Sequence, residues 1–326
     1  MLSLNKFIKT IDQLEDAWVL LAALKFRLFT LLAKKSLTVR QVARLSKTQC
    51  EGMEALLNSL VAMQALRYKA GKYSNTSEMH KYFCATSPHY LKGTAFLKLE
   101  KNDEWTQLIN TIKQGRDLSA FEGGDDKNFR YLFTHAMHER SVDYASTIAK
   151  KISSKPVGRF LDLGGGPGSY SAAILQADKK SEATLLDRPA AIKVAKELFH
   201  KRSFFKRFHF LPGDLFDSAY GKDYDMVFFS NILHIYNLEE NKKLFQKINR
   251  ALVPGGRFIL VDYFLKEDRT GPYEGALFSL TMLLFTKTGK TYTYGETEKI
   301  LRQTGFHKIK RTQLAEGNGM LEAFKK

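Results

Sequence analysis

The chain has 326 residues, of which 44% are hydrophobic and 26% charged, the balance of an ordinary globular protein. Its length exceeds the size at which one hydrophobic core stops growing, so more than one domain is expected. It has no run of about 18 uninterrupted apolar residues and no amino-terminal signal pattern, and its two cysteines are too few for a disulfide framework or a metal cluster. We therefore expect a cytoplasmic protein without a membrane span.

The net charge of +17 is the one unusual bulk property of the chain. A field of this sign attracts polyanions such as nucleic acid or an anionic membrane surface. The basic residues are nevertheless scattered, without the blocks of Lys and Arg that are typical of a nucleic-acid-binding tail. This distribution favours solvated surface lysines, and no nucleic-acid partner is expected.

The amino-terminal part of the chain has the pattern of a small helical domain. Apolar residues at helical spacing predict one helix over residues 12–33 and a short amphipathic helix over 38–46. Thr48 and Glu51 stand at capping-box distance from each other. They predict the start of a further helix over residues 50–66.

A short hairpin over residues 68–74 is predicted to follow these helices. The order helix, turn, helix, wing indicates a winged helix-turn-helix domain, which we place at residues 1–84. Residues 85–151 have the pattern of helices with a polar break at 123–126. We expect them to form a helical connector that contributes to the cover of the functional site.

The carboxyl-terminal part, residues 152–326, alternates short apolar strands with helices. Strands are predicted at 159–163, 184–187, 209–212, 225–230 and 257–263, with helices between them such as 190–199 and 238–252. This alternation is typical of a parallel sheet covered on both faces. The last two strands, 307–313 and 320–324, are separated by a glycine-containing turn and should pair antiparallel. The predicted fold class is therefore α/β, with a doubly wound, mostly parallel, seven-stranded sheet behind a mainly helical winged-helix domain.

An apolar strand runs into a glycine-rich turn at residues 160–171, Phe-Leu-Asp-Leu-Gly-Gly-Gly-Pro-Gly-Ser-Tyr-Ser. Glycines there let the backbone approach a ligand closely, and the amide groups of the following helix face that ligand. A dinucleotide-binding turn would need a glycine where the chain has Ser169. Asp162, just before the glycines, would repel a pyrophosphate and suits a cationic amino-acid ligand better.

Two further acids stand at the ends of the next two strands. Asp187 ends one of them, where a carboxylate can accept hydrogen bonds from both hydroxyls of a ribose. Asp214 follows the other, where a carboxylate with apolar neighbours can hold the edge and the face of an adenine. The alternative is that Asp162, Asp187 and Asp214 only cap helices at the surface. Their position at three successive strand ends favours convergence on one crevice.

These motifs resemble those of the class I S-adenosylmethionine (SAM) dependent methyltransferases. The resemblance rests on Asp162-x-Gly-Gly-Gly-x-Gly, Leu186-Asp187-x-Pro189, Gly213-Asp214-x-Phe216 and Leu252-x-Pro254-Gly-Gly256. With its front domain, nearly the whole chain is similar to the bacterial and plant small-molecule O-methyltransferases of the caffeate, hydroxyindole, carotenoid and antibiotic-tailoring types. In that family the winged helix mediates dimerisation. The resemblance therefore implies SAM as the cofactor and a homodimer through the amino-terminal domain.

The resemblance also implies which residues hold the two reactants. The expected cofactor-binding set is Ser141, Asp162, Gly164, Gly165, Gly166, Asp187, Arg188, Gly213, Asp214, Leu215, Phe216, Ser230 and Asn231. The expected acceptor side is apolar and aromatic, which suits a ring-bearing or polyene molecule. It consists of Phe133, Met137, Tyr236, Phe278 and Met282.

Methyl transfer from a sulfonium to a hydroxyl needs a group that removes the hydroxyl proton, and histidine suits this task near neutral pH. His234 follows the fourth strand of the predicted sheet, above the crevice, and its counterpart in the family is the general base. Asp262, at the end of the next strand, matches a family acid that hydrogen-bonds the base and fixes its tautomer. The alternative for His234 is a packed or helix-capping residue, and the acid in register favours catalysis.

The chain departs from the family pattern at three positions. Ile235 stands where the family usually has an acid directly after the base, and Thr291 stands in place of a second supporting acid. Ser230 stands in place of a lysine that often flanks the adenine. The predicted function is transfer of a methyl group to a hydroxyl of a small aromatic or polyene metabolite. Carbon or nitrogen methylation by positioning alone, without an obligatory base, stays open as an alternative.

Two other kinds of site are consistent with parts of the sequence. A DNA-binding regulator with a SAM-sensing domain would fit the winged helix and the charge. The second helix of the motif, however, presents Glu51 and Glu54, which would repel phosphate. His135 and His138 lie one turn apart and could bind a metal weakly, but the histidines show no metal-ligand spacing overall. We interpret this pair as acceptor-pocket residues and expect no metal.

Overall fold

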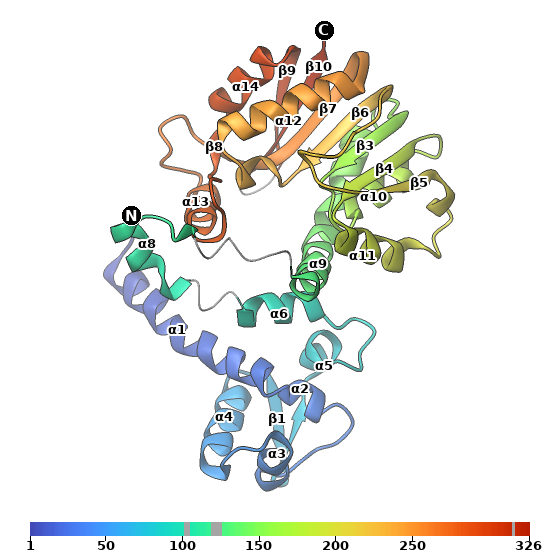
Figure 1. Ribbon diagram of the computed structural model, residues 1–326. Helices are drawn as coiled ribbons and strands as arrows, with labels where there is room; N and C mark the ends of the chain where they lie inside the picture. Colours follow the sequence, from blue (N-terminus) through green and yellow to red (C-terminus); the bar gives the residue numbers. More distant parts are fainter. Residues whose placement is uncertain (101–104, 119–125, 315–316) are drawn as a thin grey trace. The chain divides into compact units, whose positions relative to one another are not determined.

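The computed structural model describes residues 1–100, 105–118, 126–314 and 317–326. Contacts between residues divide the chain into two compact units, Met1–Asn102 and Asp103–Lys326 (Figure 1). The boundary falls within the segment 85–151 that the sequence predicts as a connector. Among the described helices, none combines the length and the apolar character needed to cross a membrane.

The first unit is helical apart from one small hairpin. The strands β1 and β2 pair antiparallel, and helices and hairpin share one apolar core that includes Leu28, Phe29, Leu57, Leu60 and Tyr73. The predicted mainly helical amino-terminal domain is therefore confirmed. Its elements are α1 (Leu4–Lys25), α2 (Leu28–Leu31), α3 (Val39–Ser46), α4 (Cys50–Ala62), β1 (Leu66–Lys69), β2 (Lys72–Asn75), α5 (Ser77–Phe83) and α6 (Lys92–Glu100).

The single helix predicted over residues 12–33 is wrong at both ends. The helix α1 begins earlier, at Leu4, and the chain breaks at Arg27, whose φ of 53° lies in the left-handed region. The break lets Leu28 and Phe29 turn into the core of the unit, where both are buried. Burial of these two side chains therefore overrides the continuous helical pattern of the sequence.

The capping box predicted at Thr48 and Glu51 is also wrong. The Thr48 hydroxyl lies 3.0 Å from the hydroxyl of Ser46 at the end of α3, so it is engaged there instead. Gln49 occupies the N-cap position of α4 and makes no side-chain capping bond. The helix starts at the predicted residue but ends at Ala62, because the chain turns there into the hairpin.

The second unit alternates strands and helices, as predicted. The unit also contains two 3₁₀ turns, η2 (Phe205–Arg207) before β5 and η3 (Leu233–Ile235) after β6. Its other elements are α8 (Leu108–Gln114), α9 (Lys127–Ile152), β3 (Arg159–Leu163), α10 (Ser169–Ala177), β4 (Glu182–Asp187), α11 (Pro189–Phe199), β5 (Phe208–Pro212), β6 (Tyr224–Ser230), α12 (Leu238–Ala251), β7 (Leu252–Leu265), α13 (Tyr273–Phe285), β8 (Tyr292–Thr293), α14 (Tyr294–Gln303), β9 (Phe306–Gln313) and β10 (Asn318–Lys325).

The sheet of this unit has the order β5-β4-β3-β6-β7-β10-β9, and the two-residue strand β8 adds to it by pairing with β7. The five strands from β3 to β7 pair parallel. The strand β10 runs antiparallel between β7 and β9, so the predicted terminal hairpin is present. The mostly parallel α/β fold is confirmed.

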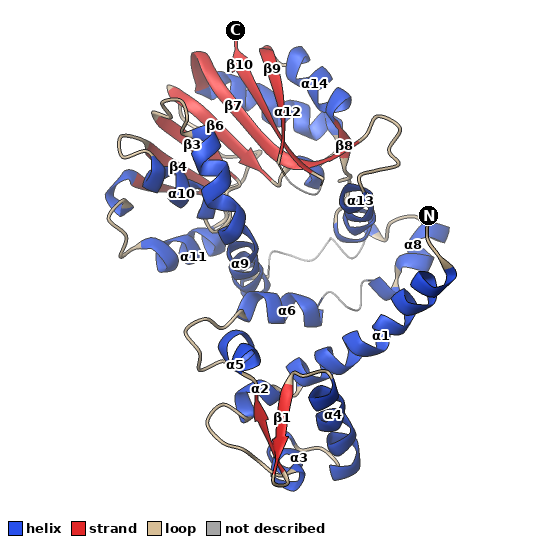
Figure 2. Cartoon of the chain, turned by 180° about the vertical axis from the view of Figure 1, so that it is seen from behind, coloured by secondary structure: helices blue, strands red, loops and turns tan. Residues whose placement is uncertain are grey.

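Helices cover both faces of the sheet (Figures 1 and 2). The helices α9, α10 and α11 pack on one face through a core that includes Ile148, Ile174 and Ile192. The helices α12 and α14 pack on the other through Leu244 and Leu301. The strand order reverses between β3 and β6, and the carboxyl ends of parallel strands beside such a reversal form a binding crevice.

Candidate active site

The glycine-rich loop joins β3 to α10 at the carboxyl edge of the sheet. Gly166 has a φ of +56°, which glycine adopts without strain, and its amide donates a 2.7 Å hydrogen bond to Asp187 Oδ2. Gly165 has no room for a side chain, since an added Cβ would lie 2.3–2.4 Å from the carboxyl atoms of Asp162. The loop backbone therefore packs directly onto two of the predicted acids.

Asp162 is almost completely buried near the end of β3, at 1% exposed. Its Oδ2 accepts a 2.6 Å hydrogen bond from the Ser171 hydroxyl, whereas its Oδ1 has no hydrogen-bond partner among the described residues. Burial raises the pKa of Asp162 to about 7; the Ser171 bond opposes this rise, and the nearby Asp187 adds to it. A buried carboxyl group with one unpartnered oxygen fits a cationic group as its partner.

The ends of β4 and β5 are tied to each other through Asp187 and Gly213. Asp187 accepts a 2.6 Å hydrogen bond from the Arg188 amide, and burial raises its pKa against the backbone bonds from Arg188 and Gly166. The Gly213 amide donates a 3.0 Å bond to the Asp187 carbonyl. The Asp214 carboxylate lies 3.9 Å from the Arg188 guanidinium. These predicted cofactor residues therefore lie next to one another.

An aromatic pair stands beside Asp214. Asp214 Oδ1 accepts a 2.7 Å hydrogen bond from the Phe216 amide, and the Phe216 ring meets the Tyr236 ring edge-on at 5.0 Å. Burial raises the pKa of Tyr236, and Asp214 adds to the rise. Tyr236, expected on the acceptor side, therefore lies with the expected cofactor residues. Leu215 packs below the loop, since a Cβ added at Gly164 would lie 3.5 Å from its Cδ1.

The end of β6 adds a polar cluster to the same edge of the sheet. Asn231 has a left-handed φ of 58°, and its Nδ2 donates a 2.9 Å hydrogen bond to the Ser230 hydroxyl. Tyr170, in the first turn of α10, reaches this cluster: burial raises its pKa, and hydrogen bonds with Ser230 and Asn231 lower it. Sequence reasoning missed Tyr170, because only the folded sheet brings α10 to the end of β6.

His234 and Asp262 meet at the ends of two neighbouring strands. His234 lies in η3, just after β6, and its Nδ1 is 2.6 Å from Asp262 Oδ1 in β7. Both side chains are buried, and the same carboxylate oxygen accepts a 2.7 Å bond from the Tyr263 amide. The Phe278 ring stands edge-on to the imidazole at 4.7 Å and lies 4.3 Å from the Tyr263 ring. The predicted pair is therefore in contact, next to a predicted acceptor residue.

The helix α9 carries three predicted residues at intervals of four, Phe133, Met137 and Ser141. The Ser141 hydroxyl donates a 3.1 Å hydrogen bond to the carbonyl of His138. His138 Nδ1 lies 2.8 Å from the hydroxyl of Ser169, the first residue of α10, and burial lowers the pKa of His138. One imidazole therefore links α9 to the helix that follows the glycine loop, a link that the sequence did not reveal.

The remaining acceptor candidates lie on two helices. Met282 is buried on α13, one turn after Phe278. Phe133 on α9 stacks against Phe129 at 5.9 Å, and Met137 is half-buried. Of these candidates, Phe278 is seen against the imidazole of His234.

Among the described residues, the two histidines of α9 have different partners. His135 Nε2 approaches Glu197 Oε2 at 3.9 Å, while His138 bonds to Ser169. In the described part of the chain, no group of three or more His, Cys, Asp or Glu side chains could hold a metal ion.

The chain is similar to known proteins over almost its whole length. Its relatives include the tetracenomycin polyketide synthesis 8-O-methyl transferase of Streptomyces glaucescens, 27% identical over 303 residues that cover 91% of this chain and 89% of that protein. They also include the acetylserotonin O-methyltransferase of Gallus gallus, 26% identical over 315 residues that cover 89% and 88%. An O-methyltransferase family protein from Burkholderia thailandensis has the same fold, with a TM-score of 0.86 at 22% identity over 100% of this chain and 99% of that one.

Two family models divide the chain between them. One, described as an O-methyltransferase domain, matches residues 99–307, and the other, described as an O-methyltransferase dimerisation domain, matches residues 9–81. The first match alone spans more than half of the chain. The chain therefore belongs to the SAM-dependent O-methyltransferase family, with a methyltransferase domain behind a dimerisation domain.

Proposed function

We propose that this enzyme methylates a hydroxyl group of a small aromatic or polyene metabolite, with His234 as the general base and Asp262 as the acid that orients it. The observation that carries the proposal is the 2.6 Å hydrogen bond between His234 Nδ1 and Asp262 Oδ1. It lies at the edge of the sheet where the glycine loop and the three acids also lie. A histidine beside a buried carboxylate is an arrangement suited to proton removal.

The cofactor side is proposed to hold SAM, which when bound supplies a methyl group on a positively charged sulfur. Asp162 receives the ammonium group, and its unpartnered buried oxygen supports this assignment. Asp187 receives the ribose hydroxyls, and Asp214 with Phe216 and Tyr236 holds the adenine. The rest of the proposed set is Ser141, Gly164, Gly165, Gly166, Arg188, Gly213, Leu215, Ser230 and Asn231.

The base works through one defined tautomer. The Asp262 carboxylate accepts the proton of Nδ1, which leaves Nε2 of the neutral ring as an acceptor. With an acceptor bound, Nε2 would take the proton of its hydroxyl group, and Asp262 would stabilise the imidazolium that results. The Tyr263 amide holds the carboxylate in place for this role.

The acceptor is proposed to be a ring-bearing molecule with a hydroxyl group. Phe278 contacts the imidazole, and Met282 is buried one turn away on the same helix. The names of the two relatives mention a polyketide and acetylserotonin, and both name O-methylation. Ile235 stands where the family usually has an acid, and this departure leaves one alternative mechanism open. In it the acceptor is already an anion or a carbon nucleophile, and its positioning suffices for methyl transfer without a base.

Replacement of the base separates these two mechanisms. His234→Ala should lower kcat by about 10²–10⁴ fold and leave the Kd of S-adenosylhomocysteine nearly unchanged, since the base acts on the acceptor. Asp262→Asn should also lower kcat, because it keeps a hydrogen bond to the ring but favours the wrong tautomer. Near-normal turnover of His234→Ala would show that His234 is not the base and would favour positioning alone.

We further propose a homodimer through residues 1–84. The dimerisation model matches 9–81, and one side of α1 exposes large apolar residues. Phe7, Ile8, Ile11, Leu14 and Trp18 are between 49% and 58% exposed, more apolar surface than a lone helix leaves in water. Residues 85–151 are proposed as the connector that covers the site and 152–326 as the SAM-binding domain, and the enzyme is proposed to act in the cytoplasm.

A further inference from the structure

His234 lies in a turn whose backbone needs outside support. The turn η3, Leu233–Ile235, is a single 3₁₀ turn between β6 and α12. Carbonyl groups in such a short turn have few partners of their own, and buried carbonyls without partners are costly. Leu233 and His234 are both buried, at 1% and 7% exposed. The position of the base therefore depends on which groups bind the carbonyls around it.

One side-chain amide binds the carbonyls on both sides of the base. Asn241 Nδ2, on α12, donates to the carbonyls of Leu233, Tyr236 and Asn237, each at 2.9 Å. An amide has two hydrogens, so these three carbonyls share them. Asn241 is completely buried, and its Oδ1 has no hydrogen-bond partner among the described residues. Burial of that oxygen is costly, and only the donor side of the amide offsets the cost.

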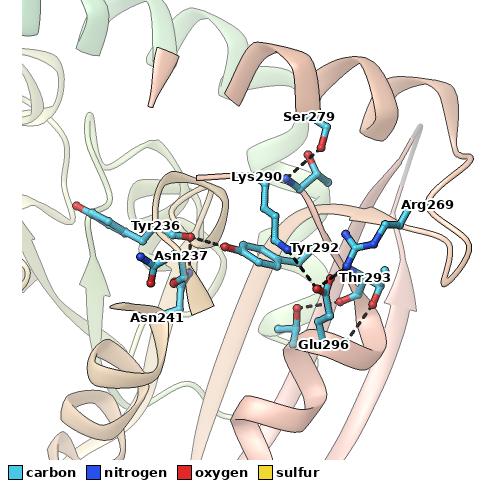
Figure 3. A network of polar contacts seen from close by, with 11 residues as sticks. Tyr236, Asn237, Asn241, Arg269, Ser279, Lys290, Tyr292, Thr293 and Glu296 are labelled. Carbon is cyan, nitrogen blue, oxygen red and sulfur yellow. Dashed lines mark hydrogen bonds and ion pairs between the residues drawn. The ribbon is translucent and has the colours of Figure 1, made fainter. Parts of the chain in front are cut away.

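The segment after α13 supports the turn from another side (Figure 3). The Tyr292 hydroxyl donates a 2.6 Å hydrogen bond to the Tyr236 carbonyl, which also accepts from Asn241. Gly289 packs so closely that an added Cβ would lie 2.1 Å from the His234 carbonyl oxygen. The Arg116 guanidinium donates to the carbonyl of Gly289 and so fixes this contact. The peptide groups around the base are therefore held by side chains from two separate parts of the chain.

We infer that Asn241 is a positioning residue for methyl transfer: its amide fixes the turn that aims His234, with Tyr292 as a second support. The inference rests on the proposed role of His234 as the base. Asp262 fixes the orientation of the imidazole ring but does not fix the backbone that carries it. A misplacement of about 1 Å in a reacting group can cost on the order of 10²-fold in rate, so loss of this support should reach the chemistry.

The test compares two asparagines of the same helix. Asn241→Ala removes the donors at the turn, while Asn249→Ala, two turns further along α12, is the matched control. We expect Asn241→Ala to lower kcat by about 10–100 fold, a larger factor than the rise in the Kd of S-adenosylhomocysteine, whose proposed adenine contact Tyr236 also bonds to Asn241. Asn249→Ala should keep both values. Asn241→Asp should lose at least as much as Asn241→Ala, because a carboxylate facing three carbonyls repels them.

A second readout does not require turnover. The short bond between His234 and Asp262 should give a downfield imidazole N–H resonance, assigned by its loss in His234→Gln. Asn241→Ala should shift or broaden this resonance, and Asn249→Ala should preserve it. If Asn241→Ala does not fold, Tyr292→Phe removes one support with a smaller change, and should lower kcat by a few fold with the resonance shifted.

The outcomes separate this inference from the proposed function. Near-normal turnover of His234→Ala would overturn both the base and its positioning. A strong loss in His234→Ala, together with an unchanged kcat and resonance in Asn241→Ala, would overturn the positioning role alone. If Asn241→Ala misfolds, an unchanged kcat and an unchanged resonance in Tyr292→Phe would overturn the positioning role.

Discussion

Binding of S-adenosylhomocysteine should weaken as the pH falls below 7, because the proposed partner of its ammonium group loses its charge. Burial raises the pKa of Asp162 from 3.8 to about 7 in the protein. Below that pH the carboxyl group is mostly protonated, and it must release its proton before it can pair with an ammonium. The ammonium stays charged over the same range, since α-amino groups lose their proton above about pH 7.7.

The size of the effect follows from the distance to that pKa. Two units below it, at pH 5, about 1% of Asp162 is ionised, so the Kd should rise about a hundredfold, or ~2.7 kcal/mol. At pH 6 the rise should be about tenfold. The folded protein binds this proton more tightly than the unfolded chain does. The free energy of unfolding of the ligand-free protein therefore carries a contribution from Asp162 that falls as the pH rises toward 7.

Isothermal titration calorimetry in buffers of different ionisation enthalpy measures both the Kd and the protons released. Near pH 6 we expect the release of about 0.9 proton for each ligand bound, falling toward zero well above pH 7. Asp162→Asn is the control, since it cannot release this proton and should show a flatter profile. A Kd that is constant between pH 5.5 and 8, without proton release, would refute the assignment of Asp162 to the ammonium.

Two further predictions concern the cofactor and the assembly. Asp187→Ala should weaken S-adenosylhomocysteine binding by about 1.5–3 kcal/mol, the cost of losing a charged acceptor to hydroxyl groups, and should reduce the ligand-induced rise in Tm; unchanged affinity by calorimetry would contradict the ribose assignment. The protein should be a homodimer by light scattering at micromolar concentration, and Trp18→Glu on the exposed side of α1 should shift it toward the monomer. A wild-type monomer with full activity would count against the dimer.

The three acids and the pair of His234 and Asp262 could be predicted from the sequence because they stand where strands end. Asp162 and Asp187 each close a short apolar run, and such runs are recognisable without an alignment. His234 and Asp262 follow two consecutive predicted strands, so the parallel sheet brings them together. By contrast, the break at Arg27 was not accessible, since an apolar pattern with helical spacing continues through it. Only the packing of Leu28 into the core decides it.

The supporting groups of the site were missed for a different reason. Asn241, Leu244, Phe245 and Ile248 are spaced i, i+3, i+4 and i+7, and all four are buried. A polar residue on an otherwise apolar stripe is the signal that could have revealed Asn241. His138 offers no such signal, because its partner Ser169 lies 31 positions away and only the fold brings them together.

The bond between His138 and Ser169 has a consequence for the linkage between cofactor binding and acceptor binding. It joins α9, which carries Phe133 and Met137, expected from the sequence on the acceptor side, to the first residue of the helix behind the glycine loop. The two helices therefore share a direct polar contact between the proposed cofactor loop and the expected acceptor side. Coupling of this kind is reciprocal: whatever factor the cofactor applies to acceptor affinity, the acceptor applies to cofactor affinity. We therefore expect the bond between His138 and Ser169 to link the binding of the cofactor to the binding of the acceptor.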